Sequence, residues 1–269
     1  MQKLDCYTSS IHLLCRNNWI DCIDYTKAAS FTGIELFGNE GNVNFEDLPE
    51  ERCMEVAAHA RKVGLKLAIH PWLDWSKLPE DEMITKYKRL VKRSVDMGMT
   101  YINMHLHFVS DRRQGMERLF RATDACMPLL EGSNTILLYE NVPDHGIRDL
   151  GSEAQDFDKL FKRYSADVPV RMNIDTGHAH IMHAMQPLAE DYGDRWVYSH
   201  VHDNDQLEDQ HLAPGSGTLS FDMVAELSQK AGYTGPLLME YNQHYLEAGM
   251  IELNRAYGAK GYTLDNITP

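Results

Sequence analysis

The sequence predicts an α/β protein folded as a single (β/α)8 TIM barrel, one domain spanning residues 1–269. Short apolar runs alternate with longer amphipathic stretches along the whole chain, as parallel strands and crossover helices do. Eight such pairs follow one another at even spacing, and no GxGxxG turn is present. Even spacing without that turn favours a closed barrel over an open, doubly wound sheet.

The eight strands are expected where the apolar runs lie, at residues 5–10, 33–37, 66–70, 101–105, 135–140, 170–175, 196–201 and 236–241. Amphipathic periodicity predicts helices between them at residues 48–63, 81–97, 114–130, 157–164, 182–192 and 221–231. Gly64, Gly98 and Gly232 each follow a helical segment and precede a strand. Glycine in this position is typical of the residue that ends a helix.

Acidic and imidazole side chains stand at the ends of successive predicted strands, where a barrel carries its functional groups. They are Glu35, His70, His105, Glu140, Asp175, His178, His200 and Glu240, with Asp209 and His211 in the loop after the seventh strand. Any one of them has an ordinary explanation as a turn cap or a satisfied polar residue. Imidazole nitrogens together with carboxylate oxygens suit Zn or Mn ions. The set as a whole therefore predicts a divalent metal site.

Composition narrows the class of protein. A formal net charge of −14 disfavours nucleic acid as a partner. No apolar run reaches the ~18 residues of a membrane span, and the first residues lack the apolar core of a signal peptide. The five cysteines form no CxxC pair, which argues against a disulfide framework or a cysteine zinc site. We therefore expect a cytoplasmic protein with no membrane partner.

Several short segments resemble the superfamily of xylose-isomerase-like TIM barrels. This superfamily includes sugar-phosphate isomerases and epimerases, ketose 3-epimerases and DNA repair enzymes of the endonuclease IV type. The resemblance covers nearly the whole chain and is carried by Gly33-Ile34-Glu35-Leu36, Asn103-Met104-His105, Tyr139-Glu140-Asn141, Asp175-Thr176-Gly177-His178, His200-Val201-His202-Asp203, Asp209-Gln210-His211 with Pro214-Gly215-Ser216-Gly217, and Leu238-Met239-Glu240.

The resemblance implies one to three divalent ions per chain. Every ligand position of the trinuclear zinc centre of the endonuclease IV type is filled: His70, His105 and Glu140 for one ion; Glu140, Asp175, His200 and Glu240 for a second; His178, Asp209 and His211 for a third. The epimerase type needs the second set alone, with His178 contacting substrate. The ligands by themselves leave both chemistries open.

Departures from the two patterns help to rank them. The loop at residues 38–42 contains no Arg or Lys, although the repair enzymes carry basic residues on such loops. Many ketose epimerases have an Arg shortly after the strand-seven histidine, where this chain has Asp205 and Gln206. The first departure argues against a DNA repair enzyme of the endonuclease IV type. The second argues against a specific assignment as a ketose epimerase.

The leading hypothesis is a metal-dependent isomerase or epimerase of a sugar, sugar phosphate or related small polyhydroxy compound, acting through a metal-stabilised enediolate. By the resemblance Glu140 and Glu240 are the catalytic acid and base. Glu35, Trp72, His107 and His202 are candidate substrate-binding residues. The alternative is an endonuclease IV type phosphodiesterase acting on abasic-site DNA. A homodimer or homotetramer is left open.

A phosphorylated substrate is also left open. The segment from His211 to Gly217 follows the seventh strand, where barrels often bind phosphate through backbone N–H groups. Arg112 and Arg113 are the only paired cations near a predicted strand end.

Overall fold

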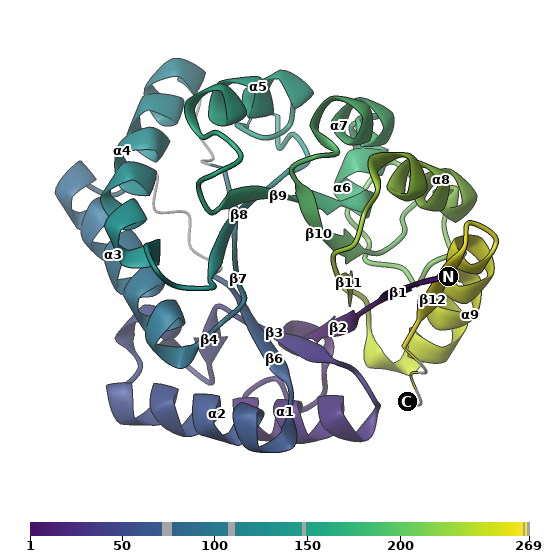
Figure 1. The fold of residues 1–269 in the computed structure, drawn as a ribbon, viewed down its shortest axis with the longest axis horizontal. Helices are drawn as coiled ribbons and strands as arrows, with labels where there is room; N and C mark the ends of the chain where they lie inside the picture. Colours follow the sequence, from purple (N-terminus) through teal and green to yellow (C-terminus); the bar gives the residue numbers. More distant parts are fainter. Residues whose placement is uncertain (72–76, 107–110, 147–148, 266, 268–269) are drawn as a thin grey trace.

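A closed barrel of eight parallel strands forms the centre of the computed structural model, which describes residues 1–71, 77–106, 111–146, 149–265 and 267 (Figure 1). Around the barrel the strand order is β10-β11-β2-β3-β6-β7-β8-β9. Their bounds are β2 (Cys6–Ser9), β3 (Gly33–Phe37), β6 (Lys66–His70), β7 (Tyr101–His105), β8 (Ile136–Glu140), β9 (Val170–Asp175), β10 (Trp196–Val201) and β11 (Leu237–Met239). The predicted (β/α)8 barrel is confirmed, and five of its strands have the expected bounds.

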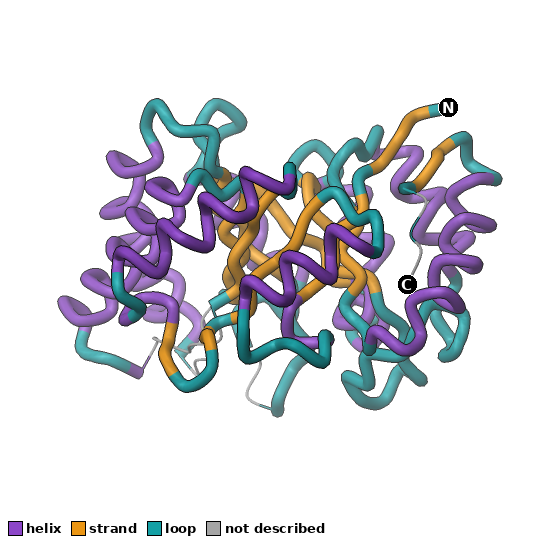
Figure 2. Tube along the Cα trace, turned by 90° about the horizontal axis from the view of Figure 1, so that it is seen from below, coloured by secondary structure: helices purple, strands orange, loops and turns teal. Residues whose placement is uncertain are grey.

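Helices enclose the barrel on its outside, as the side view shows (Figure 2). They are α1 (Trp19–Ala28), α2 (Glu50–Val63), α3 (Glu80–Met97), α4 (Arg112–Leu130), α5 (Ala154–Arg163), α6 (Thr176–Ile181), α7 (Met185–Tyr192), α8 (Phe221–Ala231) and α9 (Leu246–Gly258), with short 3-10 turns η1 (Ser10–His12), η2 (Phe45–Asp47) and η4 (Gln243–Tyr245). Over the described ranges, no helix has the length and apolar character needed to cross a membrane.

Glycines end three of these helices, as expected. Gly64, Gly98 and Gly232 have φ angles of 76°, 73° and 65°. This left-handed conformation is accessible to glycine at little cost and turns the chain back toward the next strand.

The structure also contains elements that periodicity did not reveal. Helices α1, α6 and α9 were not predicted, and the helix expected at 182–192 is present as α7, which begins three residues later than expected. Outside the barrel, β1 (Gln2–Leu4) pairs in parallel with β12 (Tyr262–Leu264), and β4 (Asn39–Glu40) forms a small antiparallel hairpin with β5 (Val43–Asn44). Helix α6 begins directly after β9, because the carboxylate of Asp175 caps its first turn.

Strand alternation decides which side chains point into the barrel. A buried layer inside it consists of Tyr7, Ala68, Leu138, Tyr198 and Leu238. Side chains two residues apart on a strand share one face. The residues two positions further along the same strands therefore also point inward, at the C-terminal end of the barrel: Ser9, His70, Glu140, His200 and Glu240. The apolar layer is thus the floor beneath the titratable residues.

Candidate metal centre

Ligand-type side chains gather at the C-terminal mouth of the barrel. Within the described part of the chain, five overlapping groups have ligand atoms within 4.8 Å of one another: His70, His105 and Glu140; Glu140, Asp175 and His200; Asp175, His178 and His202; His202, Asp209 and His211; and His12, His211 and Glu240. All nine ligands expected from the sequence occur in these groups. The structure therefore brings them together, although their roles as ligands stay predictions.

The first group lies between strands β6, β7 and β8. His70 Nε2 is 3.7 Å from Glu140 Oε2, and His105 Nε2 is 3.6 Å from Glu140 Oε1. These separations are too long for hydrogen bonds. They match the spacing of two atoms that bind the same ion at ~2.0–2.2 Å.

The second group surrounds the fully buried His200. Its Nδ1 lies 2.7 Å from Glu240 Oε2, 3.6 Å from Glu140 Oε2 and 3.7 Å from Asp175 Oδ2. On the other side of the ring, His200 Nε2 is 3.3 Å from Glu35 Oε2. Glu35 is fully buried under the site and in position to orient the imidazole, as carboxylates behind ligating histidines do. Full burial favours this orienting role over contact with substrate.

A further cluster, which takes members from two of these groups, is centred on one oxygen of Asp209. His178 Nε2 and His211 Nε2 each lie 3.2 Å from Asp209 Oδ2. The opposite ring nitrogens face main-chain carbonyls, with His178 Nδ1 2.9 Å from Asn141 O and His211 Nδ1 2.9 Å from Glu240 O. A carbonyl can only accept, so each Nδ1 carries a proton, and each Nε2 is the ring nitrogen that faces the site and would bind an ion once it has lost its own proton.

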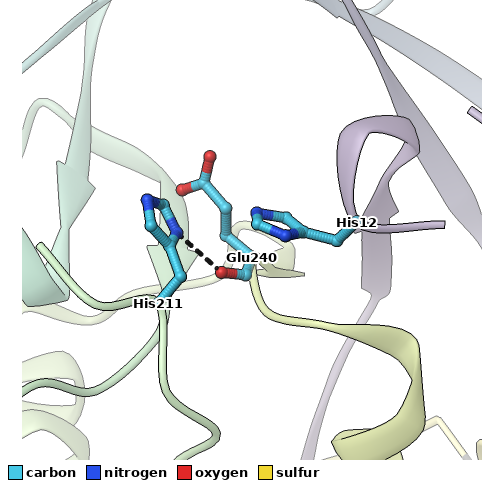
Figure 3. Close-up of side chains that lie close together, drawn as sticks. All are labelled: His12, His211 and Glu240. Atoms are coloured by element: carbon cyan, nitrogen blue, oxygen red, sulfur yellow. Dashed lines mark hydrogen bonds between the residues drawn. The ribbon is translucent and has the colours of Figure 1, made fainter.

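His12 was missed by the sequence analysis. It ends the turn η1, directly after β2, and faces the Glu240 carboxylate from the side opposite His211 (Figure 3). Burial lowers the pKa of His12 to about 4 although the charge of Glu240 opposes this shift. The signal that could have located it is an imidazole three residues beyond the first barrel strand.

His202 is fully buried and touches the ligand set directly. Its Nε2 lies 3.1 Å from Asp175 Oδ2, and the carboxylate of Asp175 also accepts a hydrogen bond of 2.7 Å from His178 N. Residues two apart on a strand share one face, but strand β10 ends at Val201, so strand alternation does not fix the direction of the His202 side chain.

Asparagine amides support the charged residues. The Asn103 amide donates to Glu140 Oε2. Asn141 bridges to the next strand, since its Nδ2 donates to Asp175 O at 3.0 Å and its Oδ1 accepts from Asp175 N at 2.8 Å. Asn173 Oδ1 accepts from His200 N at 3.0 Å. These contacts were not predicted, because an asparagine in a strand carries no distinctive sequence signal.

Comparison with known proteins agrees with this fold. Residues 23–260 match the family model described as Xylose isomerase-like TIM barrel. The chain belongs to this family.

Individual relatives are distant. An uncharacterized protein, y4fM, from Sinorhizobium fredii (strain NBRC 101917 / NGR234) is 25% identical over 175 residues, which cover 62% of this chain. The match covers 54% of that relative, so the chain spans about half the length of the curated relative it matches.

Solved structures share the fold of the family over most of their length. A D-tagatose 3-epimerase-like protein is 15% identical, with a TM-score of 0.80 over 96% of this chain and 98% of that one. The 3-keto-D-glucoside 4-epimerase YcjR from E. coli is 16% identical, with a TM-score of 0.73 over 95% and 99% of the two chains. D-psicose 3-epimerase from Clostridium cellulolyticum H10 is 15% identical, with a TM-score of 0.73 over 96% of each chain.

The electrostatics of the site suit a divalent cation. Burial alone would raise the pKa of Glu140 and of Glu240, but the positive charge of His200 outweighs burial and holds both well below the ordinary value. Conversely, burial would lower the pKa of His200, but Glu240, Glu140 and Glu35 raise it well above the ordinary value. The ionised carboxylates of Glu140 and Glu240 therefore place negative charge deep in the site, beside His200.

Several buried atoms also lack a hydrogen-bond partner among the described residues. Glu140 Oε1, His200 Nδ1 and Glu240 Oε2 accept or donate no hydrogen bond within the described ranges. His200 Nδ1 and Glu240 Oε2 lie close together without hydrogen-bonding geometry. Buried polar atoms left in this state are costly, and a cation bonded to them would remove the cost. The donor set therefore fits Zn or Mn, with nitrogen and oxygen ligands.

Trp72 and His107, two of the candidate substrate-binding residues, lie outside the described residues. The glycine-rich loop after β10 does not offer its amides to phosphate, because Gly215 N and Gly217 N donate to Asp203 Oδ2 at 3.0 and 2.8 Å, and Leu219 N donates to Asp203 Oδ1 at 3.0 Å. The suggested phosphate contact in this loop is therefore wrong, since a buried carboxylate already occupies it.

Proposed function

We propose that the protein is a metal-dependent isomerase or epimerase of a sugar or a related small polyhydroxy compound. The observation that carries the proposal is the pair of carboxylates Glu140 and Glu240, which reach one imidazole, His200, from different strands of the barrel. The structural neighbours named above are epimerases or an epimerase-like protein, which is consistent with this chemistry, but the likeness shows the fold alone.

A divalent ion in this site would supply Lewis-acid polarisation of substrate oxygens. The side chains that would hold it are Glu140, Asp175, His200 and Glu240. Glu35 would keep the His200 ring in its ligating orientation through the contact at Nε2. Asn141 and Asn173 would fix the two strand ends that carry Asp175 and His200.

Glu140 and Glu240 are proposed to move the proton. An ionised carboxylate can remove a proton from a carbon next to a carbonyl, and a second carboxyl group that carries a proton can return it from the other face. Glu140 ends β8 and Glu240 follows β11, and β9 and β10 lie between them in the barrel order. This separation allows the two groups to approach a substrate from two sides. The low pKa keeps whichever of the two acts as base ionised at neutral pH, and the other must take up a proton before it can donate one.

The test is exchange of carbon-bound hydrogen with solvent. The protein loaded with Mn²⁺ or Zn²⁺ is incubated in D2O with a panel of ketoses, and deuterium incorporation and epimer formation are followed by NMR. We expect incorporation at one carbon next to the carbonyl, and a loss of about 100-fold or more in Glu140→Gln and in Glu240→Gln. Glu208→Gln, at an exposed glutamate in the same mouth region, is the matched control.

The exchange activity of the variants decides whether Glu140 and Glu240 take part in the reaction. Full exchange activity in Glu240→Gln would remove that carboxylate from the mechanism. Circular dichroism of each variant separates loss of chemistry from loss of fold.

One observation favours the second candidate, a phosphodiesterase of the endonuclease IV type. His178, Asp209 and His211 also lie together, as the third ion of that pattern would require. The isomerase needs no third set of ligands. Metal analysis distinguishes the two: about one ion per chain favours the isomerase, and three favour the phosphodiesterase.

A further inference from the structure

A pocket of about 310 Å³ opens beside the candidate metal centre. It is lined by Ser10, Ile11, Arg16, Asn17, Phe37 and Asn39. Its volume is at the lower end of the range for small-molecule sites. Ser10 and Ile11 follow β2, and Phe37 ends β3, so the pocket lies at the same C-terminal end of the barrel as the metal ligands.

Two of its lining residues, Ile11 and Phe37, adjoin residues of the metal centre. The Phe37 ring meets the His70 ring edge-on, with centroids 5.3 Å apart. On the other side, His12 follows Ile11 in the turn η1, and the His12 ring lies 5.1 Å from that of His211. A ligand with one end near Glu140 and Glu240 could therefore extend into this pocket.

We propose that Arg16 binds an anionic group of the substrate, a carboxylate or a phosphate ester, at the end remote from the reacting carbon. The inference rests on the proposed function and specifies its substrate class. Among the residues that the structure describes, the exposed Arg16 guanidinium has neither an ion pair nor a hydrogen bond. A free guanidinium presents a planar fork that matches both anions.

Two other arginines in the loops and helix starts at this end of the barrel already have partners. Arg52 binds Glu40 at 2.6 Å and Glu55 at 2.7 Å. Arg112 donates to Asp149 O at 2.8 Å and pairs with Asp156. Among the residues that line the pocket, Arg16 therefore has a positive charge that no described residue pairs with and that a ligand could bind.

The amides of the loop after β10 are not an alternative anion site. They donate to the buried Asp203 carboxylate, as described above. An anion bound at that loop would have to displace a carboxylate from its own hydrogen bonds.

The negative net charge of the protein gives the positive charge of Arg16 significance for the choice of substrate. With a net charge of −14 and several ionised carboxylates at the mouth, the protein repels anionic substrates in general. A neutral sugar would not need a guanidinium in its pocket. The polar groups of Asn17 and Asn39 on the same wall suit the hydroxyls between the two ends of such a substrate.

Binding of matched sugars tests the proposal. Mn²⁺-loaded protein is titrated calorimetrically with D-fructose, D-fructuronate and D-fructose 6-phosphate, at low and at high salt. We expect one of the two anionic sugars to bind at least about tenfold more tightly than D-fructose. The preferred anion identifies carboxylate or phosphate recognition, and high salt should reduce the preference.

Variants assign the preference to Arg16. Arg16→Gln should bring the preferred anion and D-fructose to within about twofold of each other, and Arg16→Lys should retain part of the difference. Lys62→Gln removes the same charge from an exposed position near the end of α2 and should change nothing. Because Arg16 is exposed, these variants are expected to fold normally.

The inference is overturned if neither anionic sugar binds more tightly than D-fructose, or if Arg16→Gln keeps the preference. The deuterium-exchange assay separates this failure from failure of the proposed function. Exchange on neutral ketoses without anion preference would keep the isomerase and reject the role of Arg16. Anion preference that depends on Arg16, without exchange on any sugar, would keep the binding site and reject the isomerase.

Discussion

The imidazole of His202 is stacked on that of His211, with ring centroids 4.2 Å apart and ring planes inclined by 20°. This contact joins the end of strand β10 to the loop that carries Asp209. On its edge, His202 is packed against the Gly177 backbone, where an added Cβ would lie 2.0 Å from His202 Cε1. The position of both rings therefore depends on the absence of a side chain at residue 177.

Gly177→Ala should displace His202 and disturb the Asp209 group. We expect a loss of about 1–3 kcal/mol in the free energy of unfolding, measured by urea denaturation, and weaker Zn²⁺ binding. Gly258→Ala is the control, because residue 258 is helical and a Cβ there meets no atom within 4 Å. Equal stability and metal affinity in Gly177→Ala and the native protein would refute this packing argument.

Glu35→Gln should weaken metal binding without unfolding the barrel. The change removes the negative charge 3.3 Å from His200 Nε2, which holds the ring in place. Loss of such an outer partner lowers metal affinity by about 10–100-fold, to be measured by competition with a chelator. Glu46→Gln tests another buried glutamate, which binds Lys86 at 3.2 Å, and should leave metal affinity unchanged. Similar losses in both variants would point to a general effect of burying an amide.

Asp203→Asn should loosen the loop after β10. Its two carboxylate oxygens accept from the backbone N–H groups of Asn204, Gly215, Gly217 and Leu219. An amide replaces one acceptor with a donor, so we expect a loss of about 2–4 kcal/mol in stability and faster hydrogen exchange at these amides. Asp205→Asn, at an exposed aspartate that accepts from Leu207 N, should cost far less. Unchanged exchange at Gly217 would contradict the role assigned to Asp203.

Metal loading should release protons near pH 7.5. In the metal-free site nearby carboxylates overcome burial, raising the pKa of His211 to about 9 and that of His178 and His200 well above the ordinary value. These imidazoles are then protonated, but they must be neutral to bind an ion. Calorimetry in buffers of different ionisation enthalpy should detect the release, and His211→Gln should reduce it.

The same pKa values fix the direction of the pH dependence. A raised pKa in the folded state stabilises the metal-free protein below pH ~6.5, and this contribution is lost as the pH rises toward 9. Metal affinity should therefore increase over that window while the stability of the metal-free protein falls. Metal affinity that is flat from pH 6.5 to 9 would show that the histidines are neutral before loading.

Duplex DNA with an abasic site should be neither bound nor cut. DNA affinity comes largely from Lys and Arg contacts to phosphates, and the chain has a net charge of −14 that three divalent ions would not neutralise. Gel-shift and incision assays near physiological salt, with Zn²⁺ or Mn²⁺ supplied, are expected to be negative. Metal-dependent incision at ~1 s⁻¹ or faster would promote the phosphodiesterase alternative.

Sequence patterns predicted the barrel more completely than the details of the site. Each strand can be recognised in the sequence from a short apolar run. A residue at the end of such a strand, such as His70 or Glu140, is then placed at the mouth of the barrel by the fold. His12 lies beyond its strand, in a turn whose direction no periodicity specifies. The function of Asp203 was equally hidden, because its partners come from residues 204–219 and depend on how that loop folds back.

The apolar layer formed by Tyr7, Ala68, Leu138, Tyr198 and Leu238 closes the barrel beneath the ligands. Ions and substrate must consequently enter and leave through the same open end of the barrel. A sugar seated above the deepest ligands would stand in the path of an ion leaving the site, which imposes an order of loading in which the ion enters first and departs last. A chelator should then remove the ion from the protein more slowly when a sugar is bound at this entrance.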